Sequence, residues 1–381
     1  MQKLFAILFI TCIFTYSCNS PSLGIFNKKS ASERYAEKVE NRYQKTPEGR
    51  QWLAASRSAV EHPYLVQVPY KQHGSFHADK PRAMGLQFHA KRGEQLKFSI
   101  DKSSEAAFIL FADIYKLDAS GQSLVFTADT ANASFTFNVD EEADFVLKLQ
   151  PELFMSGNYS LSVAVGPSLA YPVSGSMAKA GSFWGAARDG GKRNHEGIDI
   201  FAPKGTPVVA ASDGMITAVR DGGIGGKTIW LRPAGRNISL YYAHLDEQLI
   251  QPGASVKAGD TIGTVGNTGN AQTTQPHLHF GVYGYGGATD PLPFINKIVK
   301  QAAAVQKKKI EKHLQLTKAH KTLNGLPLKA NTILVPLAVD AKGYIAELPD
   351  GQLVQTPFNI VKQVEIGTVS ASPLNANAGT E

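Results

Sequence analysis

Residues 276–280 read Pro276-His277-Leu278-His279-Phe280, and this stretch decides how the middle of the chain folds. Successive side chains of a β-strand point to opposite faces, so both imidazoles would leave one face while Leu278 and Phe280 enter a core. The Cα atoms of the two histidines would lie about 6.6 Å apart. One ring can then bind a metal ion while its neighbour stands within reach of a substrate.

A second group of candidate ligands lies upstream, in His195-Glu196-Gly197-Ile198-Asp199. An extended chain would put His195 and Asp199 about 13 Å apart, too far for both to bind one ion. The chain must therefore bend between them, and Gly197 supplies a permissive backbone for the bend. A strand is predicted from Ile198 onward, with Asp199 facing away from the core.

One further histidine follows the apolar run 240–243. The alternation of that run predicts that His244 points to the same side as Leu240 and Tyr242. A catalytic zinc keeps three protein ligands and an open position, and an imidazole with a pKa near 6.5 can transfer protons at neutral pH. Five candidates for three places leave two for acid–base chemistry. These candidates are His195, Asp199, His244, His277 and His279.

From Trp184 to Pro293 the chain resembles the lysostaphin and LytM family of zinc endopeptidases, also called glycyl-glycine peptidases. Five motifs in family order carry the resemblance, and together they are specific where a single His-x-His would be weak. The motifs are His195 to Asp199, Gly205-Thr206-Pro207-Val208, Tyr242-Ala243-His244-Leu245, Gly259-Asp260-Thr261-Ile262-Gly263, and Pro276 to Phe280.

The resemblance implies a β-groove domain that hydrolyses peptide bonds in the stem peptides or cross-links of bacterial peptidoglycan. It implies zinc as cofactor, bound by His195, Asp199 and His279, with His244 and His277 as catalytic histidines. Loops at 188–194, 222–226 and 268–275 would line the cleft. The bond that is cut, and which histidine is acid or base, stay open.

A fixed offset also indicates duplication within residues 173–294, the predicted peptidase domain. Gly205, Val208 and Ala210 recur 48 positions later as Gly253, Val256 and Ala258. The pattern predicts a repeated β-unit.

Two other functions remain as alternatives. Relatives of this family that lack the zinc ligands regulate separate wall amidases, but no ligand is missing here. Residues 253–263 also resemble the hairpins of lipoyl, biotinyl and phosphotransferase carrier domains. A carrier's attachment lysine, for which Lys257 could be mistaken, would explain neither the histidines nor Asp199.

The rest of the chain is predicted to be mainly β, in several domains. Residues 18–63 should form a tether followed by two short helices, with a break at residues 46–49. Alternating apolar and polar runs predict an antiparallel sandwich over residues 64–168, similar to pre-peptidase domains. A basic linker helix is expected at 295–325, an SH3-like wall-binding module at 326–369 and a disordered tail at 370–381.

The N-terminus has the features of a lipoprotein export signal. An apolar run from Leu4 to Phe14 is too short for a permanent membrane span, and Cys18 follows it as the candidate lipidated residue. The other cysteine, Cys12, would be removed with residues 1–17. We therefore expect a protein anchored in the cell envelope, at the outer membrane facing the periplasm or at the cell surface.

Charge indicates an anionic partner without identifying it, because 39 Lys and Arg residues exceed 32 Asp and Glu residues. Peptidoglycan and a membrane, contacted through the lipid anchor, are the expected partners. Nucleic acid is not expected, since no basic cluster is interleaved with aromatic residues. The oligomeric state is left open.

Overall fold

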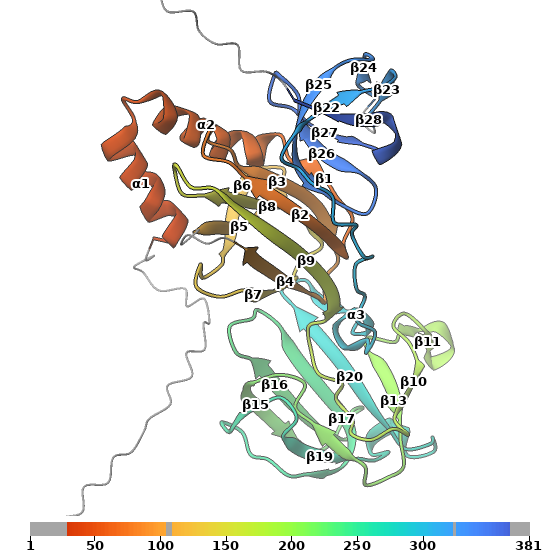
Figure 1. Cartoon of the computed structure of the whole chain (residues 1–381). Coiled ribbons are helices and arrows are strands. Elements are labelled where there is room, and N and C mark those ends of the chain that lie inside the picture. The colour runs from red at the N-terminus through yellow and green to blue at the C-terminus, as the bar shows by residue number, and fades with distance from the viewer. Residues whose placement is uncertain (1–28, 104–108, 323–324, 366–381) are drawn as a thin grey trace, which may run out of the picture.

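The computed structural model describes residues 29–103, 109–322 and 325–365 (Figure 1). Strands far outnumber helices, so the prediction of a mainly β protein is confirmed. The predictions for residues 1–17, Cys18 and residues 370–381 lie outside the described residues.

Two helices precede the strands, α1 (Ala31–Tyr43) and α2 (Pro47–Glu61). A capping box between Ser30 and Glu33 begins α1, and the Thr46 side chain caps α2, which has a proline in its first turn. The helix pair packs on a sheet through Trp52, whose buried ring donates Nε1–H to the Pro151 carbonyl at 2.9 Å.

Residues 64–167 form two packed sheets. The first has the strand order β1-β3-β8-β5-β6, and the second begins β7-β4-β9-β2. Phe88 of the first sheet meets Phe98 of the second, with ring centroids 6.2 Å apart in the shared core. The strands are β1 (Tyr64–Leu65), β2 (Tyr70–Phe76), β3 (Met84–Ala90), β4 (Glu94–Ser103), β5 (Leu110–Asp118), β6 (Gly121–Thr127), β7 (Ser134–Asn138), β8 (Ala143–Pro151) and β9 (Gly157–Pro167).

The second sheet continues into the C-terminal part of the chain, which lies beside β2 in Figure 1. β25 pairs antiparallel with β2, placing Ala338 opposite Gly74, and Ala338 and Ile345 join the sandwich core. Its SH3-like character stays a prediction, but this segment is not a separate body. Its main strands are β22 (His313–Leu316), β25 (Ile333–Val339), β26 (Tyr344–Glu347), β27 (Leu353–Thr356) and β28 (Val361–Val364), with the 3₁₀ turn η3 (Phe358–Ile360) before β28.

The predicted helix over 295–325 is wrong. Among the residues of this stretch that the structure describes, only the short α3 (Leu292–Ile295) is helical, and β22, β23 (His320–Lys321) and β24 (Pro327–Leu328) follow. Leu314 and Leu316 alternate into a core, and β22 gains backbone partners from both β25 and β28. Such tertiary pairing outweighs the local helix propensity of a lysine-rich stretch. The C-terminal β-segment therefore begins at His313, not at residue 326.

Residues 179–289 form a sheet with the order β10-β13-β20-β17-β16-β15-β18. β19 also pairs with β17, and β14 pairs with β19. Its elements are β10 (Lys179–Ser182), β11 (Ala187–Arg188), β12 (Arg193–Asn194), β13 (Ile198–Phe201), β14 (Pro207–Val209), β15 (Gly214–Arg220), β16 (Lys227–Pro233), β17 (Ser239–Gln248), β18 (Ser255–Val256), β19 (Thr261–Val265), β20 (His277–Gly284) and β21 (Gly287–Thr289), with 3₁₀ turns η1 (Asp189–Gly191) and η2 (Gly269–Ala271).

The two stretches of the predicted repeat share a backbone feature. Gly205 and Gly253 both adopt a left-handed conformation, with φ of 83° and 85°. Such angles favour glycine. Each glycine precedes a short strand, β14 or β18, that buries a valine, Val208 or Val256.

The two faces of this sheet differ in chemistry. One face is an apolar core that includes Ile200, Tyr242, Leu278 and Phe280, all fully buried. The alternation of β13 and β20 turns Asp199, His277 and His279 to the other face. The candidate site is therefore built on the face of the sheet that the core leaves free.

The chain enters and leaves residues 173–294 at neighbouring points. Val165, near the end of β9, exchanges two backbone hydrogen bonds with Lys300, at 3.0 and 2.7 Å. Phe294 packs against Gly93 so closely that a side chain at Gly93 would collide with the ring. Arg236 adds an ion pair with Asp140 at 2.6 Å. These contacts join residues 173–294 to the sandwich.

We expect Arg82→Met to lower the free energy of unfolding by about 2 kcal/mol, because Arg82 makes a largely buried bond of 3.0 Å to Glu347 across the sandwich and the C-terminal segment. Lys80→Met is the matched control. Lys80 binds the same carboxylate at 2.7 Å but is 46% exposed, so its loss should cost less than about 1 kcal/mol. Urea unfolding followed by circular dichroism would measure the free energy of unfolding of both variants. An equal decrease in the two variants would contradict the larger contribution assigned to the buried Arg82–Glu347 pair.

Candidate metal centre

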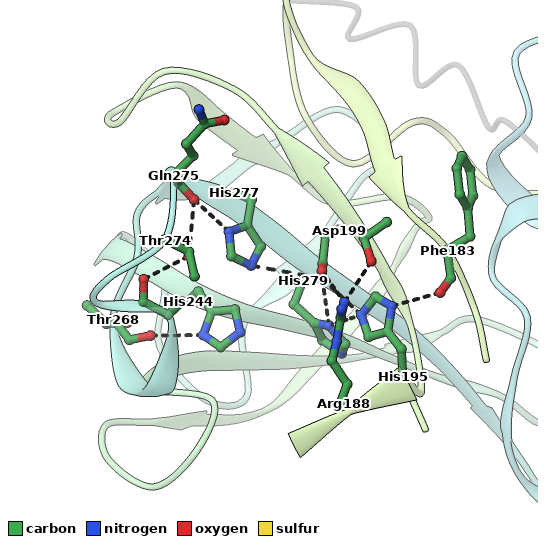
Figure 2. A network of polar contacts seen from close by, with 12 residues as sticks. Phe183, Arg188, His195, Asp199, His244, Thr268, Thr274, Gln275, His277 and His279 are labelled. Atoms are coloured by element: carbon green, nitrogen blue, oxygen red, sulfur yellow. Dashed lines mark hydrogen bonds and ion pairs between the residues drawn. The ribbon is translucent and has the colours of Figure 1, made fainter. Parts of the chain in front are cut away.

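Strand pairing brings two of the predicted ligands together. β13 and β20 are antiparallel neighbours, and their register sets Asp199 directly opposite His279. Side chains in such a pair leave the same face about 5 Å apart at Cβ. His195 joins them from the loop before β13 (Figure 2).

Three ligand atoms form a small triangle. His195 Nε2 lies 2.9 Å from Asp199 Oδ1 and 2.9 Å from His279 Nδ1, and His279 Nδ1 lies 3.0 Å from the same Asp199 oxygen. His195 is 2% and Asp199 6% exposed. Among the described residues this is the group of histidine and acidic side chains arranged to hold a metal ion.

The chemistry of the donor set fits a divalent metal such as zinc. His195 Nδ1 lies 2.9 Å from the Phe183 carbonyl, which fixes it as the protonated nitrogen and leaves a lone pair on Nε2. Nε2 of His195 and Oδ1 of Asp199 therefore present lone pairs to each other, and a cation between them would bind both. A tetrahedral ion with bonds of about 2.0–2.1 Å would separate its ligands by about 3.3–3.4 Å, a small expansion of the triangle.

Burial and the neighbouring side chains shift the pKa values of the site residues. Burial alone would raise the pKa of Asp199, but the close contacts with the His195 and His279 rings outweigh burial and hold that pKa far below its usual range. Burial is also the main cause that lowers the pKa of His279. Burial, with repulsion from His277 and His279, lowers the pKa of His244 to about 4. Asp199 is thus ionised and His244 neutral at pH 7.

Gly197 is required for a reason other than the one predicted. Its φ is not in the left-handed region, so the bend does not depend on that freedom. A Cβ at Gly197 would instead lie 2.6 Å from Cε1 and 2.7 Å from Nε2 of His279. The missing side chain leaves room for the His279 ring beside the His195 loop.

His277 and His244 stand next to the triangle. Each directs Nδ1 to a backbone carbonyl, that of Gln275 at 2.8 Å for His277 and that of Thr268 at 2.9 Å for His244. The two rings are 5.1 Å apart between centroids, and His277 Nε2 lies 3.9 Å from Asp199 Oδ1. Figure 2 shows both rings on the same side of the sheet as Asp199. Both Nε2 atoms are therefore available to a substrate.

The predicted orientation of His244 is wrong. Leu240 and Tyr242 point into the core, whereas His244 lines the pocket on the opposite side. His244 has a φ of 61°, an uncommon left-handed value that interrupts the alternation of β17. Its N–H donates to the Gly225 carbonyl at 2.9 Å, which holds the kink.

The side chains surround a pocket of about 430 Å³. The three loops expected to line the cleft all contribute, since Arg188, Gly225 and Asn270 are among the lining residues. Tyr241 and Tyr283 add aromatic walls that the motifs do not single out. All five predicted site residues line this pocket.

Several parts of the site have no signature in the sequence. The carbonyls of Phe183, Thr268 and Gln275 set three histidine rings, but any residue type supplies a carbonyl. Arg188 binds Asp199 Oδ2 at 2.6 Å, and its only signal was a positive charge in a glycine-rich loop.

Comparison with known proteins identifies the same region. The model of peptidase family M23 matches residues 193–291. Peptidoglycan DD-endopeptidase ShyC of Vibrio cholerae is 41% identical over 86 residues, 23% of this chain and 19% of that protein. L-Ala–D-Glu endopeptidase of Bacillus subtilis is 39% identical over 126 residues, 30% of this chain and 38% of that protein.

A similar solved structure is the catalytic domain of lysostaphin from Staphylococcus simulans, 36% identical over 31% of this chain and 91% of that domain, with a TM-score of 0.29. The part of this chain that matches its curated relatives covers 19% to 40% of the length of those relatives. Because the family model aligns with the stretch that carries the triangle, residues 193–291 form a peptidase M23 domain.

Proposed function

We propose that the protein is a zinc-dependent endopeptidase that hydrolyses peptide bonds in the stem peptides or cross-links of peptidoglycan. The observation that carries the proposal is the convergence of His195, Asp199 and His279 within hydrogen-bond distance, beside two further histidines. The name of the Vibrio cholerae relative, a peptidoglycan DD-endopeptidase, supports peptidoglycan as the substrate.

The residues that would hold zinc are His195 through Nε2, Asp199 through Oδ1 and His279 through Nδ1. When bound, zinc supplies a Lewis acid that polarises a carbonyl and lowers the pKa of water. Two imidazoles and one carboxylate would leave one coordination position open for water or substrate, whereas a structural zinc site has four protein ligands.

His277 and His244 would transfer the protons of the reaction. Their Nδ1 atoms are engaged by carbonyls, so each ring presents Nε2 to the pocket. A neutral Nε2 can accept a proton from attacking water, and a protonated one can return it to the leaving amine or stabilise the oxyanion. The rings of the two histidines lie side by side, and either order of acid and base is compatible with their positions.

The non-catalytic regulator is the weaker alternative. Such relatives lack zinc ligands, whereas all three candidates here converge and two proton-transfer groups adjoin them. A carrier domain is disfavoured by the same cluster, because one modified residue would not require five converging polar side chains.

The purified protein should bind one zinc ion and shorten or release peptides from purified peptidoglycan, with product masses that identify the bond. Chelation should abolish turnover, and zinc should restore it, because a peptidase of this design depends on the ion. Stoichiometric metal analysis and mass spectrometry of the digest are the measurements. Full activity of metal-free protein would end the metallopeptidase proposal, and intact peptidoglycan with zinc bound would favour the regulator.

Two classes of variant should separate ligands from proton-transfer groups. His279→Ala should lose zinc, because it removes one corner of the triangle. His277→Ala and His244→Ala should retain zinc yet lose about 100-fold to 10,000-fold in turnover. His313→Ala, on β22 of the C-terminal segment, is a control that should change neither quantity. Zinc loss in His277→Ala with zinc retained in His279→Ala would reverse the assignment.

We further propose that the protein is held in the cell envelope by lipidation of Cys18, at the outer membrane facing the periplasm or at the cell surface. Among the described residues no helix is long and apolar enough to cross a bilayer. Acyl chains contribute about 0.8 kcal/mol per buried methylene, so two or more chains would hold the protein on a membrane.

The mass of the mature N-terminal peptide tests this directly. It should begin at Cys18 and exceed the mass of the bare sequence by its acyl chains, and Cys18→Ala should abolish that increment. Membrane fractionation alone is ambiguous, because an uncut apolar run also holds a chain at a membrane. An unmodified Cys18, or a mature chain that starts elsewhere, would refute lipidation.

A further inference from the structure

The two oxygens of the Asp199 carboxylate have different partners. Oδ1 faces His195 Nε2 at 2.9 Å and His279 Nδ1 at 3.0 Å, inside the triangle. Oδ2 points away from it and accepts a hydrogen bond from Arg188 Nη2 at 2.6 Å. Figure 2 shows the Arg188 guanidinium beside Asp199 and His195. One oxygen is thus offered to a metal, and the other is already engaged.

Arg188 is itself held in place. The same Nη2 donates to Ser182 Oγ at 2.7 Å, and Ser182 lies directly opposite Asp199 in the pairing of β10 with β13. Ser182, Asp199 and His279 therefore follow one another across three adjacent strands. The anchor of Arg188 is built on the same sheet as the ligands.

The loop between these strands directs Arg188 to this point. β11 and β12 form a two-stranded ribbon in which Arg188 pairs with Arg193, and His195 follows directly after β12. The ribbon turns through Gly190 and Gly191, whose φ values of 70° and 90° favour glycine. The stretch between Ser182 and His195 thus folds back on itself, so that the Arg188 guanidinium contacts Asp199, a candidate ligand further along the chain.

We infer that Arg188 is a positioning residue that reserves Oδ2 of Asp199 and so presents Oδ1 alone to the metal. This inference rests on the proposed function. A carboxylate free to rotate can offer either oxygen or both, and a second bound oxygen would occupy a position that a catalytic site keeps open. A charge-assisted bond of 2.6 Å restrains that rotation. Partners of this kind outside the ligand set orient ligands and tune affinity.

A merely structural role for Arg188 would give a different result. The guanidinium is 30% exposed, and exposed ion pairs usually contribute less than about 1 kcal/mol to stability. If the contact only stabilised the ribbon, its removal would change thermal stability slightly and metal binding not at all. Metal affinity and coordination number are therefore the readouts that separate the two roles.

The experiment measures zinc affinity of the purified protein by competition with a chelator, and the visible absorption of the cobalt-substituted protein. Arg188→Ala should weaken zinc binding by about 10-fold to 100-fold. Its cobalt absorption should fall toward that of a five-coordinate ion, because both Asp199 oxygens become free to bind. Arg188→Lys should recover part of the affinity, since it restores a positive donor without the planar fork.

Arg232→Ala is the matched control, because it removes an exposed guanidinium from β16, a strand of the same sheet that lies outside the ribbon and the pocket lining. Its zinc affinity and cobalt spectrum should match those of the unaltered protein. Arg188→Gln, which keeps most of the stem, replaces the alanine variant if that variant fails to fold.

Zinc affinity and a cobalt spectrum unchanged in Arg188→Ala would overturn this inference alone. Failure of the unaltered protein to bind zinc would overturn the proposed function and the positioning role with it. The two failures are therefore distinguishable in one set of measurements.

Discussion

The antiparallel pairing of β13 with β20 is the constraint on which the site depends. Its register places Asp199 opposite His279, and the alternation of both strands sends Leu278, Phe280 and Ile200 into the core. A slip of one residue would exchange the two faces, burying the ligands and exposing the apolar side chains. The hydrophobic core therefore fixes the polar site, because the same register satisfies both.

Much of this arrangement could be predicted from the sequence. The single-residue spacing of His277 and His279 predicts that both rings leave the same face of a strand. The motifs from His195 onward indicate the family, and the family model supports that prediction. The convergence of His195, Asp199 and His279 follows from those two facts. The mainly β fold follows from alternating runs and many turn residues.

Other features depend on contacts that a linear pattern does not contain. The orientation of His244 was predicted wrongly because a single left-handed residue, held by the Gly225 carbonyl, reverses the side that alternation implies. The helix predicted over 295–325 failed because β22 finds strand partners about 20 and 50 residues further along the chain. In both cases a distant backbone group decides the local conformation.

The closeness of Val165 and Lys300 affects how the chain would tolerate a change in the segment between them. The sandwich and the C-terminal strands, which lie on either side of that segment in the sequence, share one sheet and one core. A segment whose ends meet can be lengthened or shortened at a small cost in chain entropy, because that cost grows only with the logarithm of its length. The shared sheet is thus suited to accept another folded segment of similar end-to-end distance at this point.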